Sequence, residues 1–352
     1  MPLLLALLCG LTFLVGAAPD LAGEEEWNKC NGPKKPLILD HDGNYDDILV
    51  LLALLKSQHV DLQAVLITPA DCELDPAVEV TGRVLAMLNR TVPVVPGQFP
   101  ERYNPFPKVW RELASEMQQV ADIYLQESEI HRPSEAAHEW LESYLGNASE
   151  KTDFLLTGPA TNLNWALRQR PHLASKVGRV FWMAGAVEVD GNVRDSDEPG
   201  KVQWSDGSAE WNAYWDPLAT RELLELNLDL WLVPLDATNA VPVHKDFIQR
   251  LNPRHQVPRV AQQIWAQSKF QKSNAIYYMW DTLTAGLYLK PSLATWRSMH
   301  LEGHTEGRRQ GRIARAHRGA ARGTVRVASE TDVPAFTEFL LSIFNEAKPG
   351  EL

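Results

Sequence analysis

Short apolar runs and segments of helical periodicity alternate along this chain from residue 36 onward. The strand-like runs lie at 36–39, 61–68, 153–157, 178–184 and 229–235. Helical patterns follow or separate them at 46–58, 75–90, 161–169, 216–227, 273–289 and 333–346. Because strands that alternate with helices need crossover connections, this order predicts an α/β fold with a mostly parallel, doubly wound (Rossmann-like) central sheet and helices on both faces. We expect one domain over residues 36–348.

The composition is that of an acidic globular protein. The 352 residues include 45 Asp and Glu against 34 Lys and Arg, a formal charge of -11. This acid excess argues against a nucleic-acid partner, which would require a basic surface. With 45% hydrophobic and 22% charged residues, the chain can bury a sizeable core and is not mostly disordered. Twelve Trp outnumber the ten Phe and the eight Tyr, a surplus that needs a reason.

The N-terminal segment has the pattern of a secretory signal. Leu3–Ala18 is an apolar run that ends in small residues and is followed directly by Pro19 and Asp20. The run is slightly short for a membrane span, which favours a cleaved signal peptide over residues 1–18 and a secreted protein without membrane attachment after cleavage. Because no Lys or Arg precedes the run, an uncleaved anchor or a wrongly assigned start is the alternative.

Secretion would bear on the cysteines and on two glycosylation motifs. Cleavage would remove Cys9 and leave Cys30 and Cys72, and the sequence leaves open whether these two form a disulfide. Asn89-Arg90-Thr91 and Asn147-Ala148-Ser149 match the N-glycosylation sequon. Both motifs fit an exported glycoprotein.

An arginine-rich segment stands near the C-terminus. Residues 308–322 hold six Arg in fifteen positions, although the chain around them is acidic. We expect a solvated basic loop, with a polyanion-binding patch or a misjoined piece of sequence as the alternatives. The segment is atypical of the domain in which it lies.

Polar residues follow each predicted strand, which is where open parallel sheets place their ligands. In chain order they are Asp40, Asp42, Asp46, Asp47, Asp71, Thr157, Asn162, Glu188, Asn192, Asp236, Thr238 and Asn239. So many carboxylates on one edge are costly unless a cation or a substrate compensates their charge. The pattern therefore predicts an active site at the C-terminal ends of the strands.

The densest part of this edge is residues 40–47, DHDGNYDD, with four carboxylates in eight residues. Gly43 permits a sharp turn between strand and helix, so that several oxygens can point toward one place. Oxygen ligands without a cysteine or a histidine pair favour Ca²⁺ or Mg²⁺ over zinc, and the spacing is not that of an EF-hand. The alternative, that Asp46 and Asp47 merely open a helix, leaves Asp40 and Asp42 unexplained. His41 lies between two site acids, but we expect it to point to the opposite face of the strand.

The segment LILDHDGNYDDILVLL resembles the DxDxxxDD signature of the inosine-uridine preferring nucleoside hydrolase family, whose members are N-ribohydrolases. Further segments match in the same order, at 157–162, 183–186, 209–212 and 233–236, so that the resemblance spans about residues 36 to 307. The chain is most similar to the purine-specific inosine-adenosine-guanosine branch, through 70–72, 104–110, 211–217 and 277–281. Other branches commonly have a His where Trp280 stands.

This resemblance implies a set of metal and catalytic roles. Asp42, Asp47, Asp281 and the backbone carbonyl of Thr157 would hold one Ca²⁺, whose remaining positions would take water and the ribose 2′- and 3′-hydroxyls. Asp42 would also be the catalytic general base on the water that attacks C1′, through an oxocarbenium-like transition state.

The resemblance also implies how the substrate is held. Asp46, Asn192, Glu210 and Asn212 would bind the ribose hydroxyls, and Asn44 and Asp71 would lie near the sugar and the base. Trp110 and Trp280 would sandwich the leaving purine and favour its protonated form. For Trp211 and Trp215 we favour a packing role.

The expected activity is therefore Ca²⁺-dependent hydrolysis of purine ribonucleosides (inosine, adenosine, guanosine) to free base and ribose. A broad or uridine-preferring hydrolase and a non-catalytic secreted nucleoside-binding protein are the alternatives. Family members are often homodimers or homotetramers, and no surface feature of this sequence decides between them.

Overall fold

The computed structural model describes residues 34–126, 128–194, 205–267, 276–316 and 323–346. The chain divides into two units, residues 1–32 and 33–352, and every described residue belongs to the second. The signal peptide predicted at 1–18 and Cys30 lie outside the described residues.

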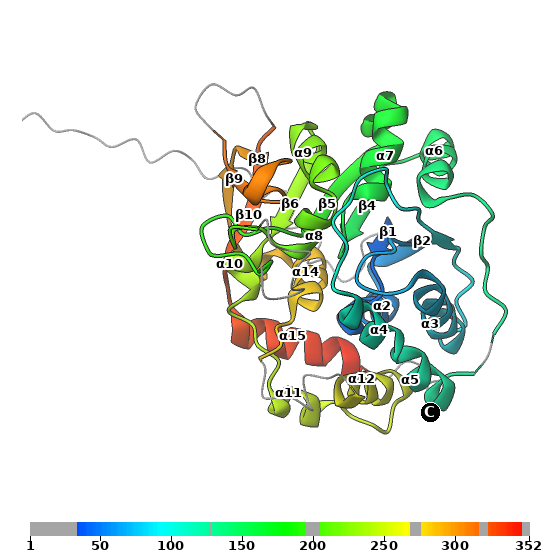
Figure 1. Cartoon of the computed structure of the whole chain (residues 1–352). Helices are drawn as coiled ribbons and strands as arrows, with labels where there is room; N and C mark the ends of the chain where they lie inside the picture. Colours follow the sequence, from blue (N-terminus) through cyan, green and yellow to red (C-terminus); the bar gives the residue numbers. More distant parts are fainter. Residues whose placement is uncertain (1–33, 127, 195–204, 268–275, 317–322, 347–352) are drawn as a thin grey trace, which may run out of the picture. The chain divides into compact units, whose positions relative to one another are not determined.

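An eight-stranded sheet forms the centre of the second unit (Figure 1). Its strands are β1 (Lys35–His41), β2 (Val60–Ile67), β3 (Val94–Pro96), β4 (Thr152–Leu156), β5 (Val177–Met183), β6 (Asp229–Val233), β7 (Ala294–Met299) and β10 (Val325–Thr331). They lie in the order β3-β2-β1-β4-β5-β6-β10-β7, and every neighbouring pair is parallel except β10 with β7. The mostly parallel, doubly wound sheet predicted from the sequence is thus confirmed. Its strand order reverses between β1 and β4, the switch point at which such sheets bind ligands.

Helices cover both faces of the sheet, as the alternating pattern predicted (Figure 1). On one face α6, α7 and α9 pack side by side, and on the other α2 packs against α3, α12, α14 and α15. The helices are α2 (Tyr45–Lys56), α3 (Leu74–Met87), α4 (Lys108–Ser115), α5 (Met117–Tyr124), α6 (Ala137–Asn147), α7 (Thr161–Gln169), α8 (Trp211–Trp215), α9 (Pro217–Glu225), α10 (Leu235–Thr238), α11 (Lys245–Arg250), α12 (Gln256–Gln267), α14 (Trp280–Leu289) and α15 (Val333–Asn345). Short 3₁₀ turns lie at η1 (Pro171–Lys176), η2 (Pro291–Leu293) and η3 (Gly307–Arg309).

Helix α2 is the most deeply buried of these elements. Every residue from Tyr45 to Lys56 is buried, and Lys56 reaches the backbone carbonyl of Glu346 beyond α15. Burying a Leu or Ile side chain contributes roughly 1.5–3 kcal/mol, so the apolar run of α2 is a large share of the core. Because helices surround α2, its N-terminus is held firmly beside the carboxyl end of β1.

The sequence pattern missed two strands at the far edge of the sheet. β10 lies beside β6 and pairs with β7, which precedes it along the chain. β7 (ATWRSM) and β10 (VRVASET) mix apolar with polar residues, so neither contains the continuous apolar run that marks the predicted strands. Other elements that were not predicted are β3, α4, α5, α6, α8, α10, α11 and α12.

The arginine-rich segment is built into a small two-stranded sheet of β8 (Leu301–Gly303) and β9 (Ile313–Arg315). Ile313 is fully buried, and a Cβ on Gly311 would meet the Cα of Tyr214 at 2.3 Å. Arg309 pairs with Asp206 at 3.4 Å. Arg308, Arg309 and Arg315 are exposed, as expected for a solvated basic segment, but Gly311 and Ile313 between them are buried, so residues 308–316 are not a plain loop. Residues 317–322 lie outside the described part.

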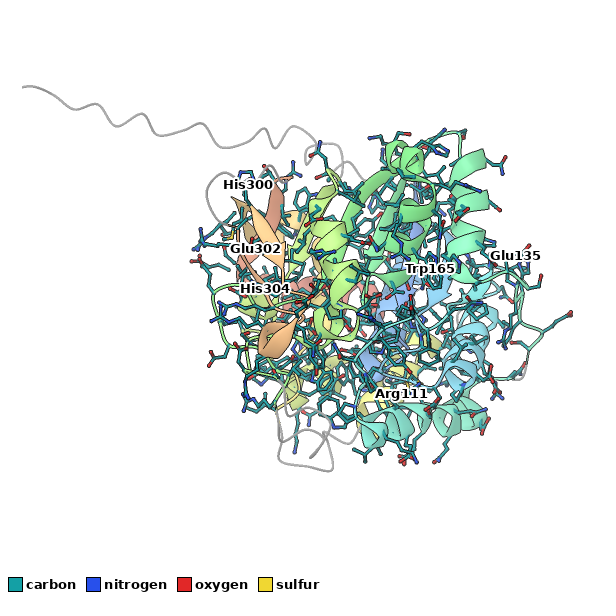
Figure 2. The ribbon with its side chains drawn as sticks, turned by 45° about the horizontal axis from the view of Figure 1, so that its top comes forward. Arg111, Glu135, Trp165, His300, Glu302 and His304 are labelled. Carbon is teal, nitrogen blue, oxygen red and sulfur yellow. The ribbon has the colours of Figure 1, made fainter. Side chains whose placement is uncertain are left out.

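The outer side of β8 carries charged and titratable groups. His300 directly precedes β8, Glu302 lies within it and His304 directly follows it; all three are at least partly exposed, whereas Leu301 is buried (Figure 2). Nε2 of His304 lies 3.9 Å from a carboxylate oxygen of Glu302. The hairpin thus presents a polar face outward and an apolar face to the domain.

Among the described residues, no helix has the length and the apolar character that a membrane span requires. Cys72 is a buried free thiol whose Sγ lies 3.6 Å from Oγ of Ser115, and burial raises its pKa to about 12. Whether Cys72 pairs with Cys30 stays open, because Cys30 lies outside the described residues.

Candidate active site

A glycine turn joins the end of β1 to the start of α2. Gly43 has a φ of +90°, and a Cβ at this position would lie 2.5 Å from the Cβ of Ala77 and 2.8 Å from that of Cys72. Any other residue would therefore be strained here and would also collide with its neighbours. This turn, predicted from the sequence, brings Asp42 to the N-terminus of the helix.

A capping box fixes the first turn of α2. The side-chain oxygen of Asn44 accepts a hydrogen bond from the backbone N–H of Tyr45 at 2.7 Å. The backbone N–H of Asn44 donates in return to Oδ2 of Asp47 at 2.8 Å, and Oδ1 of Asp47 accepts from the Thr157 hydroxyl at 2.6 Å. Asp47 is thus completely buried between the ends of β1 and β4.

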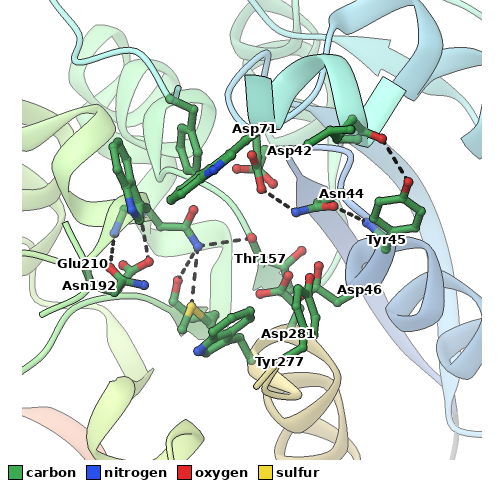
Figure 3. A pocket seen from close by; sticks show the side chains of 18 of the residues that line it. Asp42, Asn44, Tyr45, Asp46, Asp71, Thr157, Asn192, Glu210, Tyr277 and Asp281 are labelled. Carbon is green, nitrogen blue, oxygen red and sulfur yellow. Dashed lines mark hydrogen bonds between the residues drawn. The ribbon is translucent and has the colours of Figure 1, made fainter. Parts of the chain in front are cut away.

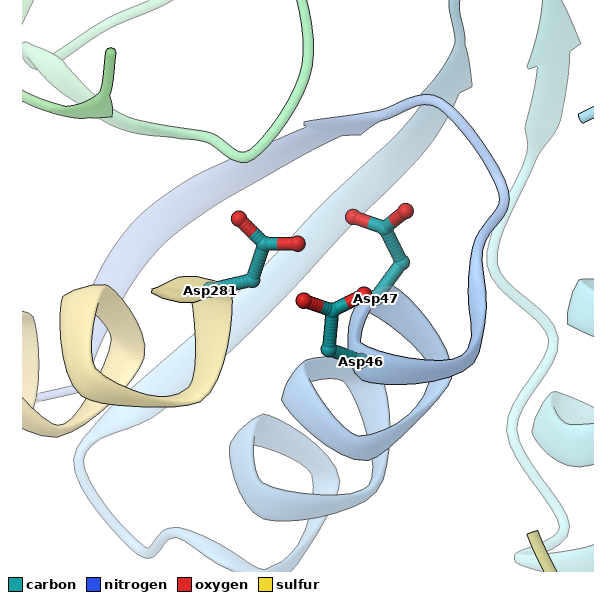
Figure 4. Close-up of side chains that lie close together, drawn as sticks. All are labelled: Asp46, Asp47 and Asp281. Atoms are coloured by element: carbon teal, nitrogen blue, oxygen red, sulfur yellow. The ribbon is translucent and has the colours of Figure 1, made fainter. Parts of the chain in front are cut away.

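Three carboxylates from two helix N-termini meet at this point (Figure 4). Asp46 and Asp47 open α2, and Asp281 stands in the first turn of α14. Each of the three offers an oxygen within 4.8 Å of the others. Asp42 interacts electrostatically with Asp46 and Asp47, and its Oδ2 is buried without a hydrogen-bond partner in the described structure.

Burial and mutual repulsion oppose ionisation of this cluster. Burial, with the neighbouring carboxylates adding to it, raises the pKa values of Asp42 and Asp281 well above the ordinary range. For the same reasons the pKa of Asp47 rises to about 8 and that of Asp71 to about 7. A bound divalent cation would offset the repulsion among these buried carboxylates. Their oxygen atoms are the ligands that a hard metal ion prefers, so the residues fit such an ion. In the structure, a carboxylate oxygen of Asp46 also lies close to those of the predicted ligands Asp47 and Asp281.

Helix α8 carries the opposite wall (Figure 3). Glu210 caps this helix: its Oε1 accepts from the Asn212 N–H at 2.9 Å, and its Oε2 accepts from the Gly185 N–H at 2.9 Å. The Asn212 amide donates to the carbonyls of Met183 at 3.1 Å and of Thr157 at 3.3 Å. Asn192 accepts from the first N–H of α8. These contacts tie the wall to the ends of β4 and β5.

Aromatic side chains line the other end of the pocket. Trp110 of α4 packs edge-on against Trp211, with ring centroids 5.3 Å apart, and Phe106 lies against Trp211 at 4.9 Å. Trp280, the first residue of α14, packs edge-on against Tyr277 at 4.7 Å. Trp110 and Trp280 are half-buried, so each leaves part of its ring exposed to the pocket.

Most of these groups line one pocket of about 580 Å³ (Figure 3). The lining includes every predicted site residue except Asp47: Asp42, Asn44, Asp46, Asp71, Trp110, Thr157, Asn192, Glu210, Asn212, Trp280 and Asp281. Asp47 lies behind the wall, where it orients Thr157 and Asn44.

Eight lining residues were not predicted to be in the site. They are Tyr45, Phe106, Val109, Leu113, Ala114, Met183, Trp211 and Tyr277. Most are apolar, and their only signal in the sequence was membership of a matched motif or proximity to one. Tyr277 faces the carboxylates: burial, and then Asp46 and Asp281, raise its pKa well above the ordinary value.

Two residues of the DHDGNYDD segment are structural. His41 is buried and its Nε2 lies within hydrogen-bond distance of the Thr81 hydroxyl, at 3.1 Å. Its side chain thus points away from the pocket, as expected from its position on the strand, and burial lowers its pKa to about 3. Asp40 lies outside the pocket and accepts from Thr68 and Asn162, both at 3.0 Å. This network ties together the ends of β1 and β2 and the first turn of α7.

The expected convergence of polar residues fails at the far strands. Asp236 accepts hydrogen bonds from the backbone N–H groups of Val187 and Glu188, and Glu188 pairs with Arg297 and Arg315. Both acids therefore secure the loop after β5 instead of lining the pocket, because the site gathers around the switch point between β1 and β4. Trp215 also packs away from the pocket, against Tyr103 and Phe99.

Comparison with known proteins agrees with this geometry. Residues 37–338 match the family described as inosine-uridine preferring nucleoside hydrolase. The pyrimidine-specific ribonucleoside hydrolase RihA of Escherichia coli is 26% identical over 226 residues, which are 61% of this chain and 65% of that enzyme. The chain therefore matches just under two thirds of that relative's length.

Solved structures of the same kind share the fold. The inosine-uridine preferring nucleoside hydrolase of Bacillus anthracis has a TM-score of 0.77 and 30% identity, covering 89% of this chain and 100% of that one. The purine-preferring ribonucleoside hydrolase of Gardnerella vaginalis has a TM-score of 0.74 at 20% identity, covering 88% of this chain and 98% of that one. The second likeness concerns the fold alone.

Proposed function

Because the chain belongs to the inosine-uridine preferring nucleoside hydrolase family, we propose that it hydrolyses the N-glycosidic bond of purine ribonucleosides to free base and ribose. The observation that carries this proposal is one pocket in which a buried carboxylate cluster adjoins an aromatic wall. Carboxylates accept hydrogen bonds from hydroxyl groups and stabilise a cationic transition state, whereas aromatic faces bind a flat base. The two ends of the pocket thus correspond to the two halves of a nucleoside.

Asp42, Asp47, Asp281 and the carbonyl of Thr157 would hold a Ca²⁺ ion, with Asp46 close by. When bound, the ion would compensate the carboxylates, prefer the vicinal hydroxyls of a ribose and lower the pKa of a coordinated water. Ca²⁺ is favoured over Zn²⁺ because these candidate ligands are all oxygens.

Asp42 is the general base in this proposal. Its Oδ2 is buried and lacks a hydrogen-bond partner in the described structure, so it can accept the proton of a water that attacks C1′. The bond from C1′ to the base nitrogen breaks as positive charge develops on the sugar. The neighbouring carboxylates then stabilise that charge by electrostatic attraction, which ground-state ribose does not experience.

Trp110 and Trp280 would assist departure of the base. A purine leaves readily once it is protonated, and indole faces stabilise a cation that lies over them. Both rings line the pocket and leave part of their surface open to it. Asn192, Glu210 and Asn212 hold the sugar from the α8 side, and Asn44, Asp46 and Asp71 hold it from the α2 side.

A broad or uridine-preferring hydrolase is the second candidate, and one observation favours it: the relative from Escherichia coli is named as pyrimidine-specific. A Trp stands at position 280, where other branches commonly have a His, and this favours the purine substrate. A two-ring base contacts an aromatic wall over more area than a one-ring base does.

The proposal is tested by measuring turnover of inosine, guanosine, adenosine, uridine and cytidine with and without Ca²⁺. We expect kcat/KM for the purine ribonucleosides to exceed that for uridine by at least tenfold. Equal values would support the broad hydrolase. Nucleoside binding without any turnover, in protein that carries its metal, would instead support a non-catalytic binding protein.

Replacing Trp280 should affect purines selectively. In Trp280→Ala we expect kcat/KM for inosine to fall by about 30-fold or more, in line with a cation–π contact of about 2 kcal/mol in a desolvated site. Hydrolysis of p-nitrophenyl riboside should fall much less, because its leaving group needs no protonation. Trp280→Phe, which keeps an aromatic face, should recover most of the inosine activity. Equal losses on both substrates would contradict the stacking role.

We further propose that the chain is exported, with residues 1–18 as its cleaved signal, and that it assembles as a homodimer or homotetramer. The first proposal is supported by the apolar run that ends at Ala18. N-terminal sequencing of protein recovered from the medium of expressing cells tests it, and an N-terminus that retains residues 1–18 would contradict it. Light scattering of the purified protein measures the assembly.

A further inference from the structure

One face of helix α6 carries a stripe of aromatic residues that ends at an asparagine. Trp140, Ser143, Tyr144 and Asn147 are spaced by three and four residues, so they lie on the same side of the helix. The rings of Trp140 and Tyr144 are stacked, with centroids 5.0 Å apart and planes 12° apart. With Ala148 these residues line a shallow groove, which we call the α6 groove.

The stacked rings of Trp140 and Tyr144, which we call the aromatic platform, are held in place by the core beneath them. Trp140 and Tyr144 pack against the core on one side and are half-exposed on the other. The Tyr144 hydroxyl lies 3.3 Å from that of Thr152 on β4. On the inner side of α6, His138 stacks on Trp165 of α7 at 3.9 Å, and Figure 2 shows where Trp165 lies. Because the rings do not need to be ordered on binding, a ligand on them loses little entropy.

The groove ends at a glycosylation sequon, Asn147-Ala148-Ser149. Asn147 is the last residue of α6, and both Asn147 and Ser149 are exposed. The Asn147 side-chain amide donates to the backbone carbonyl of Ser143 at 2.8 Å, which keeps it on the aromatic side of the helix. A group attached to this amide would therefore begin inside the α6 groove.

We propose that Asn147 carries an N-linked oligosaccharide whose first sugar packs on the Trp140–Tyr144 stack. This inference rests on the proposed export of the chain, because only exported proteins meet the glycosylating enzymes. In the transfer, Nδ2 of Asn147 loses one hydrogen and bonds to the anomeric carbon of N-acetylglucosamine. The bond from that carbon to a lipid pyrophosphate carrier breaks, and the carrier leaves with the proton.

A sugar suits this groove in both chemistry and reach. The C–H groups on a pyranose face are weakly positive and pack against the negative face of an aromatic ring. A sugar tethered at Asn147 is also at high effective concentration over the rings, which lie one and two helical turns away. Covering the stack also removes apolar surface from water, which is favourable.

The second sequon lacks the aromatic neighbours of the first. Asn89 is exposed like Asn147, but it has a φ of +53°, and residues 82–88 before it contain no aromatic side chain. A sugar on Asn89 would thus have no aromatic platform from its own helix. This sequon serves as the matched control.

Occupancy is tested by expressing the full chain in glycosylating eukaryotic cells and measuring the mass of the peptide that contains Asn147. We expect this peptide to carry a glycan, which Ser149→Ala abolishes while Asn147 is retained. In parallel, residues 1–18 are replaced by an established export signal. An unmodified Asn147 in protein exported by that signal overturns the inference. Failure of export with the native N-terminus alone contradicts only the export proposal.

Packing is tested by a stability cycle between Ser149→Ala and Trp140→Leu. Loss of the glycan through Ser149→Ala should lower Tm by about 2 °C when Trp140 is present and by less than half as much in Trp140→Leu. Tyr144→Leu provides a second platform variant in case the first folds poorly. Asn89→Gln should change Tm equally with and without Trp140. A Tm loss from Ser149→Ala that is the same in all backgrounds overturns the packing on the aromatic stack.

Discussion

Asp42→Asn should reduce kcat/KM for inosine by at least about 10³-fold and leave the fold intact. The substitution preserves volume but removes the group that accepts the proton from water, an effect that typically amounts to 10²- to 10⁴-fold. It also removes one of the candidate metal ligands, which adds to the loss. The measurement is steady-state turnover of inosine at saturating Ca²⁺, with circular dichroism to verify the fold.

The stability of the same variant provides an independent check. Burial and the neighbouring carboxylates oppose ionisation of Asp42, so a neutral Asn relieves repulsion in the metal-free protein. We therefore expect the Tm of metal-free Asp42→Asn at pH 8 to rise above that of the unsubstituted protein while activity is lost.

The matched control for Asp42 is Asp75→Asn. Asp75 is exposed at the start of α3 and pairs with Arg132 at 3.2 Å, outside the pocket. The control should retain activity within a factor of two. Activity above one tenth of normal in Asp42→Asn would contradict its assignment as the base.

Removal of the metal should have an effect of similar size. Exhaustive dialysis against a chelator is expected to lower turnover by about 10³-fold or more, because a bound divalent ion supplies several kcal/mol of charge stabilisation. Ca²⁺ should restore turnover at lower concentration than Mg²⁺, since Mg²⁺ demands stricter octahedral geometry and releases its waters reluctantly. Full turnover in protein shown by elemental analysis to hold no metal would contradict the metal site.

The metal-free protein should also lose stability as the pH rises from about 6.5 to 8. In this range an unfolded Asp is ionised, whereas the folded protein retains protons on Asp47, with a pKa of about 8, and on Asp71, with a pKa of about 7. The folded state thus binds more protons than the unfolded state, and the free energy of unfolding falls with rising pH. Below pH 6.5 the lowered pKa of His41 acts in the opposite direction.

Saturating Ca²⁺ should flatten this slope, because the ion takes the place of the protons on the cluster. A residual fall is expected from Asp40, whose pKa is raised to about 7 by burial and which lies outside the pocket. Urea denaturation at pH 6.5, 7.2 and 8.0, with chelator and with Ca²⁺, measures both slopes. Stability that rises with pH over this range in the chelator would contradict the raised pKa values.

How much of the site could be predicted depended on how local each signal was. The β1-to-α2 turn was readable because a strand, Gly43, the cap Asn44 and the first-turn acids follow one another within a few residues. For Glu210, the location in the site was predicted but its hydrogen bonds were not. Its place in the site was anticipated through the resemblance, but the use of both its oxygens to cap α8 and to hold Gly185 depends on a loop that is distant in sequence.

The aromatic residues of the pocket were also only partly predicted. Trp110 and Trp280 were singled out by their motifs, but Trp211 was expected only to pack, and it does so while also lining the pocket. Tyr277 and the apolar face of α4 carried no chemical signal of their own. Whether an apolar side chain fills a core or faces a ligand depends on what packs opposite it.

By itself, the sequence determined the alternation of β1, α2, β2, α3, β4, α7, β5, α9 and β6, the parallel sheet and the carboxylate-rich turn at its edge, because periodicity and helix capping act over a few neighbouring residues. The family resemblance had already placed Asp281 with Asp47; only the tertiary structure decided that β10 lies beside β6, that Asp46 joins these two carboxylates, and that Asp40 and Asp236 do not reach the pocket. These outcomes depend on contacts between segments far apart in the chain, whose geometry is set by the packing of the whole core.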